Sequence, residues 1–225
     1  MRETKAVFDS GEKQATIRRY NRRLTRFGVG EKALGWGEKG RSGLRNEILL
    51  SLWELKTRSI LDFGCGFGGL LDHLKTRGVP ESRYLGIDIN PRLIAQARRL
   101  HPQARFEVVD ILRDETPLSA DYVFSSGVFN HRLKDNDGFI RACLARFDEI
   151  AGRGFAVNFL SSHVDYRLKH TFHSDPARIL DLAYRYSNNV VLRNDYMPYE
   201  FTVFVDKAAA VDRTLAVYEN FRELA

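Results

Sequence analysis

An acid and a series of alternating glycines stand out between residues 60 and 69, where the sequence reads ILDFGCGFGG. Glycine is favoured where a backbone turns sharply and approaches a ligand closely, because it has no Cβ. The apolar residues before the turn are typical of a strand, and Leu70, Leu71 and Leu74 after it have helical spacing. A strand, a glycine turn and a helix N-terminus in this order indicate a corner that binds a nucleotide.

Two cofactor classes have motifs that fit this turn. Gly64, Gly66 and Gly69 match the G-x-G-x-x-G spacing of dinucleotide-binding enzymes. The acid-x-G-x-G-x-G motif of S-adenosylmethionine (SAM) enzymes fits as well, with Asp62 as its acid and Gly68 as its third glycine. The charge of Asp62 favours SAM, because a carboxylate attracts a sulfonium and an ammonium group but repels a pyrophosphate.

The elements that must position this turn alternate between strand and helix from Ser59 onward, which predicts a parallel sheet covered by helices. Two final β-rich runs, at 190–192 and 201–205, are separated by a gap too short for a crossover helix, so we expect antiparallel neighbours. A dinucleotide-binding domain built from two parallel halves does not end in this way. The predicted strands are 59–63, 84–89, 105–109, 121–125 and 154–160, and the predicted helices are 69–77, 90–100, 136–150 and 174–186.

Over residues 59–205, these motifs and this element order resemble the class I SAM-dependent methyltransferases. The resemblance implies an α/β fold with a Rossmann-like, seven-stranded, mostly parallel sheet, an antiparallel last strand, helices on both faces and extra N-terminal helices. It also implies that SAM is the methyl donor and S-adenosylhomocysteine the product.

The resemblance assigns the glycine turn to the methionine part of SAM. Asp62 would lie near the charged groups of that part, and its charge suits them. The turn residues that would hold the methionine part are Gly64, Cys65, Gly66 and Gly68.

The resemblance also assigns the ends of the next strands to the nucleoside part of SAM. Asp88 would accept hydrogen bonds from both ribose hydroxyls, a task that suits the two acceptor oxygens of one carboxylate. Asp110 would face the adenine amino group, which is likewise a donor, while Ile89 and Ile111 would pack on the ring. Ser126, where the 121–125 strand ends, completes the predicted cofactor residues.

The N-terminal segment predicts an amphipathic helix over Ser10–Phe27, a glycine-rich loop at 28–43 and a helix over 42–56. It is similar to a poorly characterised bacterial group of methyltransferases, which suggests that this segment closes over SAM. Trp36 and Arg45 are the candidate contacts, since an arginine can pair bidentately with the SAM carboxylate. We expect residues 1–57 to form a helical cap and residues 58–225 one compact SAM-binding domain.

The acceptor side is marked by two histidines, His131 after the 121–125 strand and His163 after the 154–160 strand. Histidine is the usual general base at neutral pH, and a hydroxyl acceptor must lose a proton. We therefore predict His131 as the first catalytic candidate and His163 as the second, although a loop or capping role is open for both. No acid cluster suggests a metal site.

Composition and charge set the remaining expectations. The 225-residue chain is 44% hydrophobic, has no apolar run long enough for a membrane helix and begins without the apolar stretch of a signal peptide. Its two cysteines, Cys65 and Cys143, lack metal-site spacing, so we expect a reduced cytoplasmic protein. We expect this protein to be a monomer or a homodimer. The net charge of +6 is concentrated in residues 1–45, which hold 12 Lys/Arg against 5 Asp/Glu. This excess suits a solvated helix face or an anionic partner.

These observations favour a SAM-dependent methyltransferase that acts on an oxygen or nitrogen atom of a small-molecule acceptor. One alternative is an RNA methyltransferase that contacts phosphates through the basic N-terminal segment. Another is a regulator that binds SAM without catalysing a reaction. Such a protein would have the same cofactor-binding acids as an enzyme. The small-molecule hypothesis is favoured over RNA because the sequence has no separate RNA-binding module.

Overall fold

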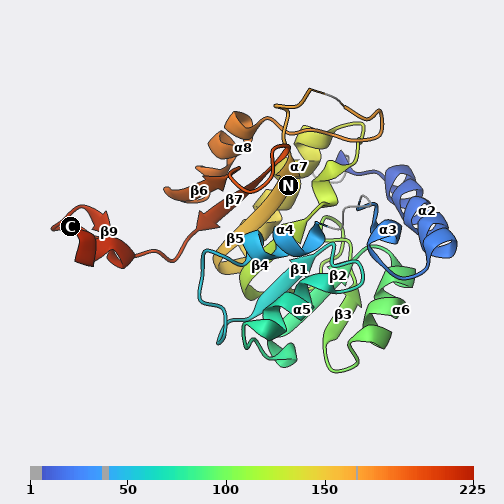
Figure 1. Cartoon of the computed structure of the whole chain (residues 1–225), viewed down its shortest axis with the longest axis horizontal. Coiled ribbons are helices and arrows are strands. Elements are labelled where there is room, and N and C mark those ends of the chain that lie inside the picture. The colour runs from blue at the N-terminus through green and yellow to red at the C-terminus, as the bar shows by residue number, and fades with distance from the viewer. Residues whose placement is uncertain (1–6, 37–40, 166) are drawn as a thin grey trace.

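A seven-stranded sheet lies at the centre of the computed structural model (Figure 1), which describes residues 7–36, 41–165 and 167–225. The strands are β1 (Ile60–Phe63), β2 (Tyr84–Asp88), β3 (Arg105–Val108), β4 (Ala120–Ser126), β5 (Ala151–Leu160), β6 (Asn189–Arg193) and β7 (Glu200–Asp206). Their order is β3-β2-β1-β4-β5-β7-β6, and β7 runs antiparallel to both of its neighbours. The order and the antiparallel last strand confirm the predicted fold class.

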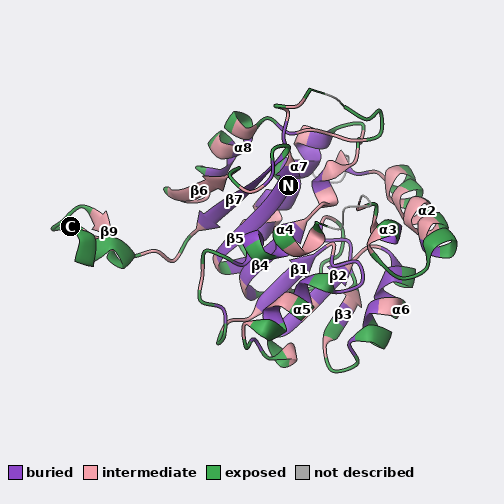
Figure 2. Ribbon diagram, viewed as in Figure 1, coloured by how far each residue is buried: buried purple, intermediate pink, exposed green. Residues whose placement is uncertain are grey.

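Helices cover both faces of this sheet, and the central strands between them are buried (Figure 2). On one face, Ile48, Leu71 and Ile94 from three helices join the hydrophobic cluster of Phe124. On the other face, Phe147 and Ile179 belong to a second cluster. The helices are α2 (Ser10–Phe27), α3 (Glu31–Leu34), α4 (Ser42–Leu49), α5 (Gly69–Thr76), α6 (Pro91–Leu100), α7 (Asn136–Ile150) and α8 (Pro176–Ala183).

Local capping signals set the starts of the longer helices. The Asp9 side chain accepts the Glu12 backbone N–H at 2.9 Å before α2. Asn90 accepts the Arg92 backbone N–H at 2.9 Å, and Pro91 takes the first position of α6, where its missing N–H is not needed. These caps explain why α2, α6 and α7 begin where the sequence predicted.

The helix predicted over 42–56 is shorter in the structure, because α4 ends at Leu49. The Leu50 N–H bonds to the carbonyl of Asn46, and the Ser51 hydroxyl donates to the carbonyl of Ile48. The end of the helix lets Trp53 stack on Tyr122 of β4, with 4.6 Å between ring centroids. Burial of this ring against the sheet outweighs the continued helical spacing of the leucines.

Two other segments differ from the sequence expectations. The predicted glycine-rich loop contains the short helix α3, while its residues 37–40, like residues 1–6, lie outside the described part of the chain. After β7 the chain leaves the body of the molecule as an arm (Figure 1), which contains β8 (Val211–Asp212), β9 (Val217–Tyr218) and the 3-10 helix η3 (Glu219–Leu224). None of the helices in the described residues has the length and apolar character needed to cross a membrane.

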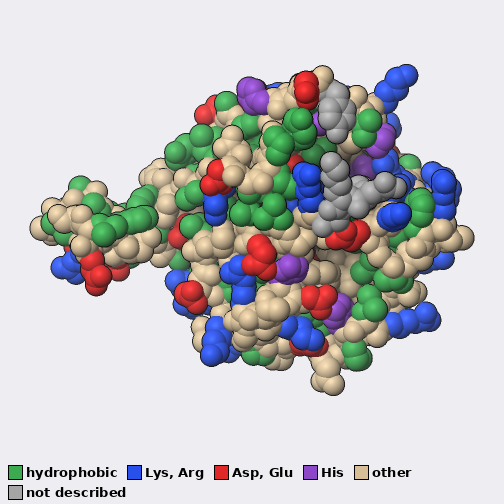
Figure 3. Space-filling model, in the orientation of Figure 1, with side chains coloured by type: hydrophobic (Ala, Val, Ile, Leu, Met, Phe, Trp, Pro, Cys, Tyr) green, Lys and Arg blue, Asp and Glu red, His purple; other side chains and the backbone are tan. Residues whose placement is uncertain are grey.

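The position of α2 matters most for the site. Tyr20 and Leu24 pack with Ala33 of α3, Phe67 of the glycine turn and Leu93 of α6. This cluster holds the N-terminal helices over the carboxyl ends of the first strands. Lys and Arg side chains gather on this side of the molecule (Figure 3), so α2 presents an apolar face to the sheet domain and a basic face to solvent.

Candidate functional site

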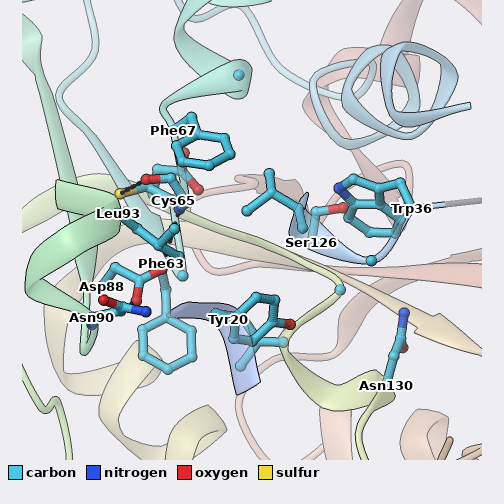
Figure 4. A pocket seen from close by; sticks show the side chains of 18 of the residues that line it. Tyr20, Trp36, Phe63, Cys65, Phe67, Asp88, Asn90, Leu93, Ser126 and Asn130 are labelled. Atoms are coloured by element: carbon cyan, nitrogen blue, oxygen red, sulfur yellow. Dashed lines mark hydrogen bonds between the residues drawn. The ribbon is translucent and has the colours of Figure 1, made fainter. Parts of the chain in front are cut away.

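A cavity of about 630 Å³ lies at the carboxyl ends of β1, β2 and β4, beneath α2 and α3 (Figure 4). It brings together segments that are far apart in the sequence: the glycine turn, the ends of the strands and the N-terminal helices. Twelve of the fourteen residues singled out from the sequence line it. They are Trp36, Arg45, Asp62, Gly64, Cys65, Gly66, Asp88, Ile89, Asp110, Ile111, Ser126 and His131.

The glycine turn after β1 is held against the neighbouring strand. The backbone N–H groups of Gly64 and Cys65 both donate to the carbonyl of Ile87, at 2.8 and 3.1 Å. Gly64 has a φ of 73°, and a Cβ at this position would lie 2.2 Å from Cγ2 of Val128. The turn therefore requires glycine both for its backbone conformation and for the close approach of the segment after β4.

Asp88, at the end of β2, connects the glycine turn to the start of α6. Its Oδ2 accepts the Gly66 N–H at 3.2 Å, and its Oδ1 accepts the Asn90 N–H at 2.8 Å. Burial raises the pKa of Asp88 to about 6, because the cavity wall disfavours the charged form. Each carboxylate oxygen has a second lone pair, so both can accept a ligand hydroxyl without losing these bonds.

Asp62 lies deeper in the cavity wall, with its side chain only 5% exposed. Its Oδ2 accepts a hydrogen bond from the Tyr84 hydroxyl at 2.8 Å. Burial raises the pKa of Asp62 to about 7, and the negative charge of Asp88 acts in the same direction. A cation bound in the cavity would lower this pKa, because it favours the ionised carboxylate. Tyr84 was missed by the sequence analysis, since nothing in its surroundings marks it as a partner of Asp62.

Asp110, the third predicted cofactor acid, is buried and paired with the N-terminal helix. Its Oδ2 lies 2.9 Å from Nζ of Lys13, and Arg113 Nε is 3.8 Å away. Its Oδ1 accepts the Leu112 N–H at 3.3 Å. Lys13 thus joins α2 to the loop after β3, a contact that the sequence did not predict.

His131 also contacts α2, through Tyr20, at another part of the cavity wall. The Tyr20 hydroxyl and His131 Nε2 are 2.6 Å apart. Burial lowers the pKa of His131 to about 4, and the nearby charges of Arg19 and Arg23 act in the same direction. The imidazole is therefore neutral at pH 7, and its buried Nδ1 has no hydrogen-bond partner among the described residues.

Arg45 and Trp36 form a separate unit at the edge of the cavity. The Arg45 guanidinium donates two hydrogen bonds to Glu200 of β7, one from Nε at 2.5 Å and one from Nη2. It also lies under the ring of Trp36, with 4.4 Å from Cζ to the centroid. A Cβ on Gly127 would meet Trp36 at 2.5 Å, so the ring rests on the turn after β4. The carboxylate partner that the structure gives Arg45 is Glu200.

Two predicted residues do not line the cavity. Gly68 caps the start of α5 with a φ of 84°, and a Cβ there would lie 2.8 Å from Phe106. His163 is exposed on the loop after β5, outside the cavity lining. By contrast, the Ser126 hydroxyl is buried in the lining and has no hydrogen-bond partner among the described residues.

The comparisons with known proteins identify the family. Residues 61–148 match the methyltransferase-domain family. The chain is 39% identical over 159 residues to Rv1506c of Mycobacterium tuberculosis, a protein named as a methyltransferase, and the match covers 67% of this chain and 94% of that protein. The chain is a class I SAM-dependent methyltransferase.

Further relatives agree with this family. Trans-aconitate 2-methyltransferase of Afipia carboxidovorans is 29% identical over 92 residues, which cover 41% of this methyltransferase and 36% of that protein. The fold is also that of magnesium protoporphyrin IX methyltransferase from Synechocystis PCC 6803, solved with bound SAM. That structure has a TM-score of 0.62 at 16% identity and covers 87% of this chain and 97% of its own.

SAM is the methyl donor of this family, and the residues of the cavity fit it. Gly64 and Gly66 line the cavity beside Asp62 without side chains of their own, and Asp88 keeps free lone pairs for a pair of hydroxyls. Ile89 and Ile111 supply apolar surface in the same lining. The acidic and apolar residues of the lining therefore match a ligand that carries cationic groups, a diol and a flat ring.

Proposed function

We propose that this methyltransferase transfers the methyl group of SAM to an oxygen or nitrogen atom of a small molecule inside the cavity. The observation that carries the proposal is one continuous cavity, with Asp88 in one part of its lining and Asn130 and His131 in another. In Figure 4, Asp88 and Asn90 lie on the opposite side of Tyr20 from Asn130. This arrangement offers one volume for a donor and an acceptor, as an in-line displacement requires.

We propose that the methionine part of SAM lies against the glycine turn, with its ammonium group near Asp62. Asp88 then accepts the two ribose hydroxyls, and the adenine packs between Ile89 and Ile111 near Asp110. Lys13 already neutralises Asp110, so α2 lies over the adenine end of the cavity. In this arrangement α2 closes the site and excludes water.

We propose that Ser126 and Trp36 contact SAM, as the sequence predicts, and that His131 lies at the acceptor end. Arg45 supports the Trp36 ring from below through its pair with Glu200, which suits a positioning role. A neutral imidazole with a pKa of about 4 is a weak base at pH 7, so the general-base role of His131 stays a prediction. For His163, exposed outside the cavity lining, we propose no part in the reaction.

Two observations support a small acceptor. Residues of α2 and α3 form part of the cavity wall, and its volume of about 630 Å³ must hold the donor as well. The names of the trans-aconitate and magnesium protoporphyrin IX methyltransferases also specify small molecules. The RNA alternative stays a prediction. The exposed arginines Arg18, Arg22 and Arg26 that motivate it lie along the outside of α2.

The test combines binding with turnover. Calorimetry with SAM and S-adenosylhomocysteine should show binding that NAD does not compete with. Formation of S-adenosylhomocysteine should then be measured with a panel of acids, alcohols and amines that includes trans-aconitate, and separately with RNA. The proposal fails if neither SAM nor its product binds, or if RNA is the only substrate methylated.

A further inference from the structure

The acceptor end of the cavity is surrounded by cationic groups. The charged or chargeable side chains that act on His131 are Arg19, His170 and Arg23. Arg19 and His170 also belong to the cavity lining. A positive charge on His131 would be repelled by Arg19 and Arg23, whereas an anion in the same place would be attracted.

Arg19 differs from Arg23 and Arg45 because its guanidinium has no hydrogen-bond or ion-pair partner among the described residues. Arg23 donates to the backbone carbonyls of Lys32 and Ala33, and Arg45 pairs with Glu200. Arg19 makes no hydrogen bond or ion pair with any residue that the structure describes. It is half-buried at the cavity wall, on α2 beside Tyr20.

Asn130 adds a second donor to this region. Its Oδ1 accepts the Leu160 N–H at 3.2 Å, which fixes the orientation of the amide. The Nδ2 group is then left as a donor with no partner in the described chain. Asn130 lies in the cavity lining (Figure 4). The next residue in the sequence is His131, whose buried Nδ1 also has no partner within the described part of the chain.

Four acids of the cavity wall have partners other than Arg19 and Asn130. Glu200 is engaged by Arg45, and the Ser42 hydroxyl donates to Glu31. Asp62 and Asp88 are held at the glycine turn by Tyr84 and by backbone N–H groups. No described carboxylate forms a hydrogen bond or ion pair with Arg19 or with the Asn130 amide, so both groups remain available as donors at the cavity wall.

We propose that the acceptor is a small carboxylate, bound by Arg19 and Asn130, and that the product is its methyl ester. This inference rests on the proposed function and names its substrate class. Guanidinium and carboxylate groups form the strongest of the ordinary charge-assisted hydrogen bonds, which suits Arg19 as the recognition residue. The neighbouring His131 then acts as a neutral hydrogen-bonding group.

The chemistry needs no general base. A carboxylate oxygen forms a bond to the methyl carbon while the bond between that carbon and sulfur breaks, and both electrons of the broken bond go to sulfur. No proton is removed from the acceptor, because a carboxylic acid is already ionised at neutral pH. The carboxylate and sulfonium charges cancel in the products, a neutral ester and a thioether.

The chemical test compares matched acceptors with methyl-labelled SAM. Citrate, fumarate and benzoate are assayed beside fumaramide and benzyl alcohol, which have similar shapes without a carboxylate. We expect label only in the acids, and we expect mild alkali to release it as volatile methanol, because esters hydrolyse where ethers and methylamines do not. Alkali-stable product, or labelling of the alcohol or amide but not of the acids, would overturn the proposal.

The residue test uses Arg19→Gln, with Arg18→Gln as the matched control on the exposed side of the same helix. Loss of a charge-assisted hydrogen bond should raise the KM for the acid by about 10- to 100-fold. Direct calorimetry of the same acid with the S-adenosylhomocysteine complex should show the same loss. Arg19→Lys should recover part of the affinity, since lysine restores the charge but lacks the planar guanidinium that can donate two parallel hydrogen bonds.

The outcomes separate this inference from the proposed function. Affinity for S-adenosylhomocysteine should be unchanged in Arg19→Gln, because Arg19 is assigned to the acceptor alone. Equal acid affinity in Arg19→Gln and Arg18→Gln would overturn the role of Arg19. If S-adenosylhomocysteine binds and an amine is methylated, the carboxylate inference fails while the methyltransferase proposal stands. If S-adenosylhomocysteine does not bind, the proposed function itself fails.

Discussion

Replacement of Asp88 by asparagine should weaken SAM binding strongly while leaving the protein folded. The wild-type carboxylate already accepts the N–H groups of Gly66 and Asn90, and the proposed site adds two ribose hydroxyls. Hydrogen bonds to a charged acceptor contribute about 1.5–3 kcal/mol, so the affinity for SAM should fall by about 10- to 150-fold. Asparagine keeps the size of the side chain and its Oδ1 acceptor, but its amide nitrogen cannot accept from Gly66.

The pH dependence of binding gives this prediction a second measurement. Asp88 has a raised pKa of about 6 in the free protein, and its ionised form is the one that accepts the hydroxyls. SAM affinity should therefore fall as the pH drops through 6 in the wild type. In Asp88→Asn this step should disappear, and the step due to Asp62, with a pKa of about 7, should remain.

Isothermal titration calorimetry with SAM, from pH 5 to 8, measures both effects. Asp181→Asn is the control, because it removes a carboxylate from the exposed side of α8, outside the cavity. Thermal unfolding checks that both variants are folded at the titration temperature. An affinity for SAM within about twofold of wild type would refute the reasoning, because it corresponds to less than about 0.5 kcal/mol.

Three further predictions concern the glycine turn, the N-terminal helix and the stability of the free protein. Gly64→Ala should lower stability by roughly 1–3 kcal/mol and weaken SAM binding, since the new Cβ meets Val128 at a positive φ. Partial recovery in the double variant with Val128→Ala would confirm the clash, and denaturant melts without any loss would contradict it. Lys13→Met should lower stability by roughly 1–3 kcal/mol, because Asp110 loses its close partner, and unchanged urea denaturation would contradict this. The free protein should lose stability as the pH rises from about 4 to 7, because the raised pKa values of Asp62 and Asp88 stabilise their protonated forms only in the folded state. An identical pH profile in the Asp62→Asn, Asp88→Asn double variant would show that other groups are responsible.

Local patterns were enough to predict the main elements of the fold. The bounds of α2 and α7 agree with the sequence because Asp9 and Asp135 cap each helix through bonds within three residues. The predicted strands have the correct order along the chain, and the final antiparallel pair follows from its short connection. The prediction that the helix starting at Ser42 continues to residue 56 was wrong, because the packing of Trp53 against the sheet is not a local signal.

The cofactor side of the site could also be anticipated, because parallel strands bring their carboxyl ends to one edge of a sheet. Asp62 and Asp88 lie in the last two residues of β1 and β2, and Asp110 follows β3, so the fold alone brings them to the same cavity. Their partners were not visible in the sequence. Tyr84 and Lys13 have no motif that links them to these acids, and only the packed structure places them within hydrogen-bond distance.

The sequence by itself determined the methyl donor and the sheet that binds it, since glycine spacing, strand-ending acids and helix caps act over a few residues. Only the tertiary structure showed the surroundings of His131 and Arg45. Tyr20 meets His131 across 111 residues of sequence, and Arg45 meets Glu200 across 155. These contacts depend on where α2 and α4 pack against the sheet domain, which follows from the burial of whole helix faces. They leave Arg19 at the cavity wall without a partner among the described residues, and they bury His131 against Tyr20, which lowers the pKa of the imidazole.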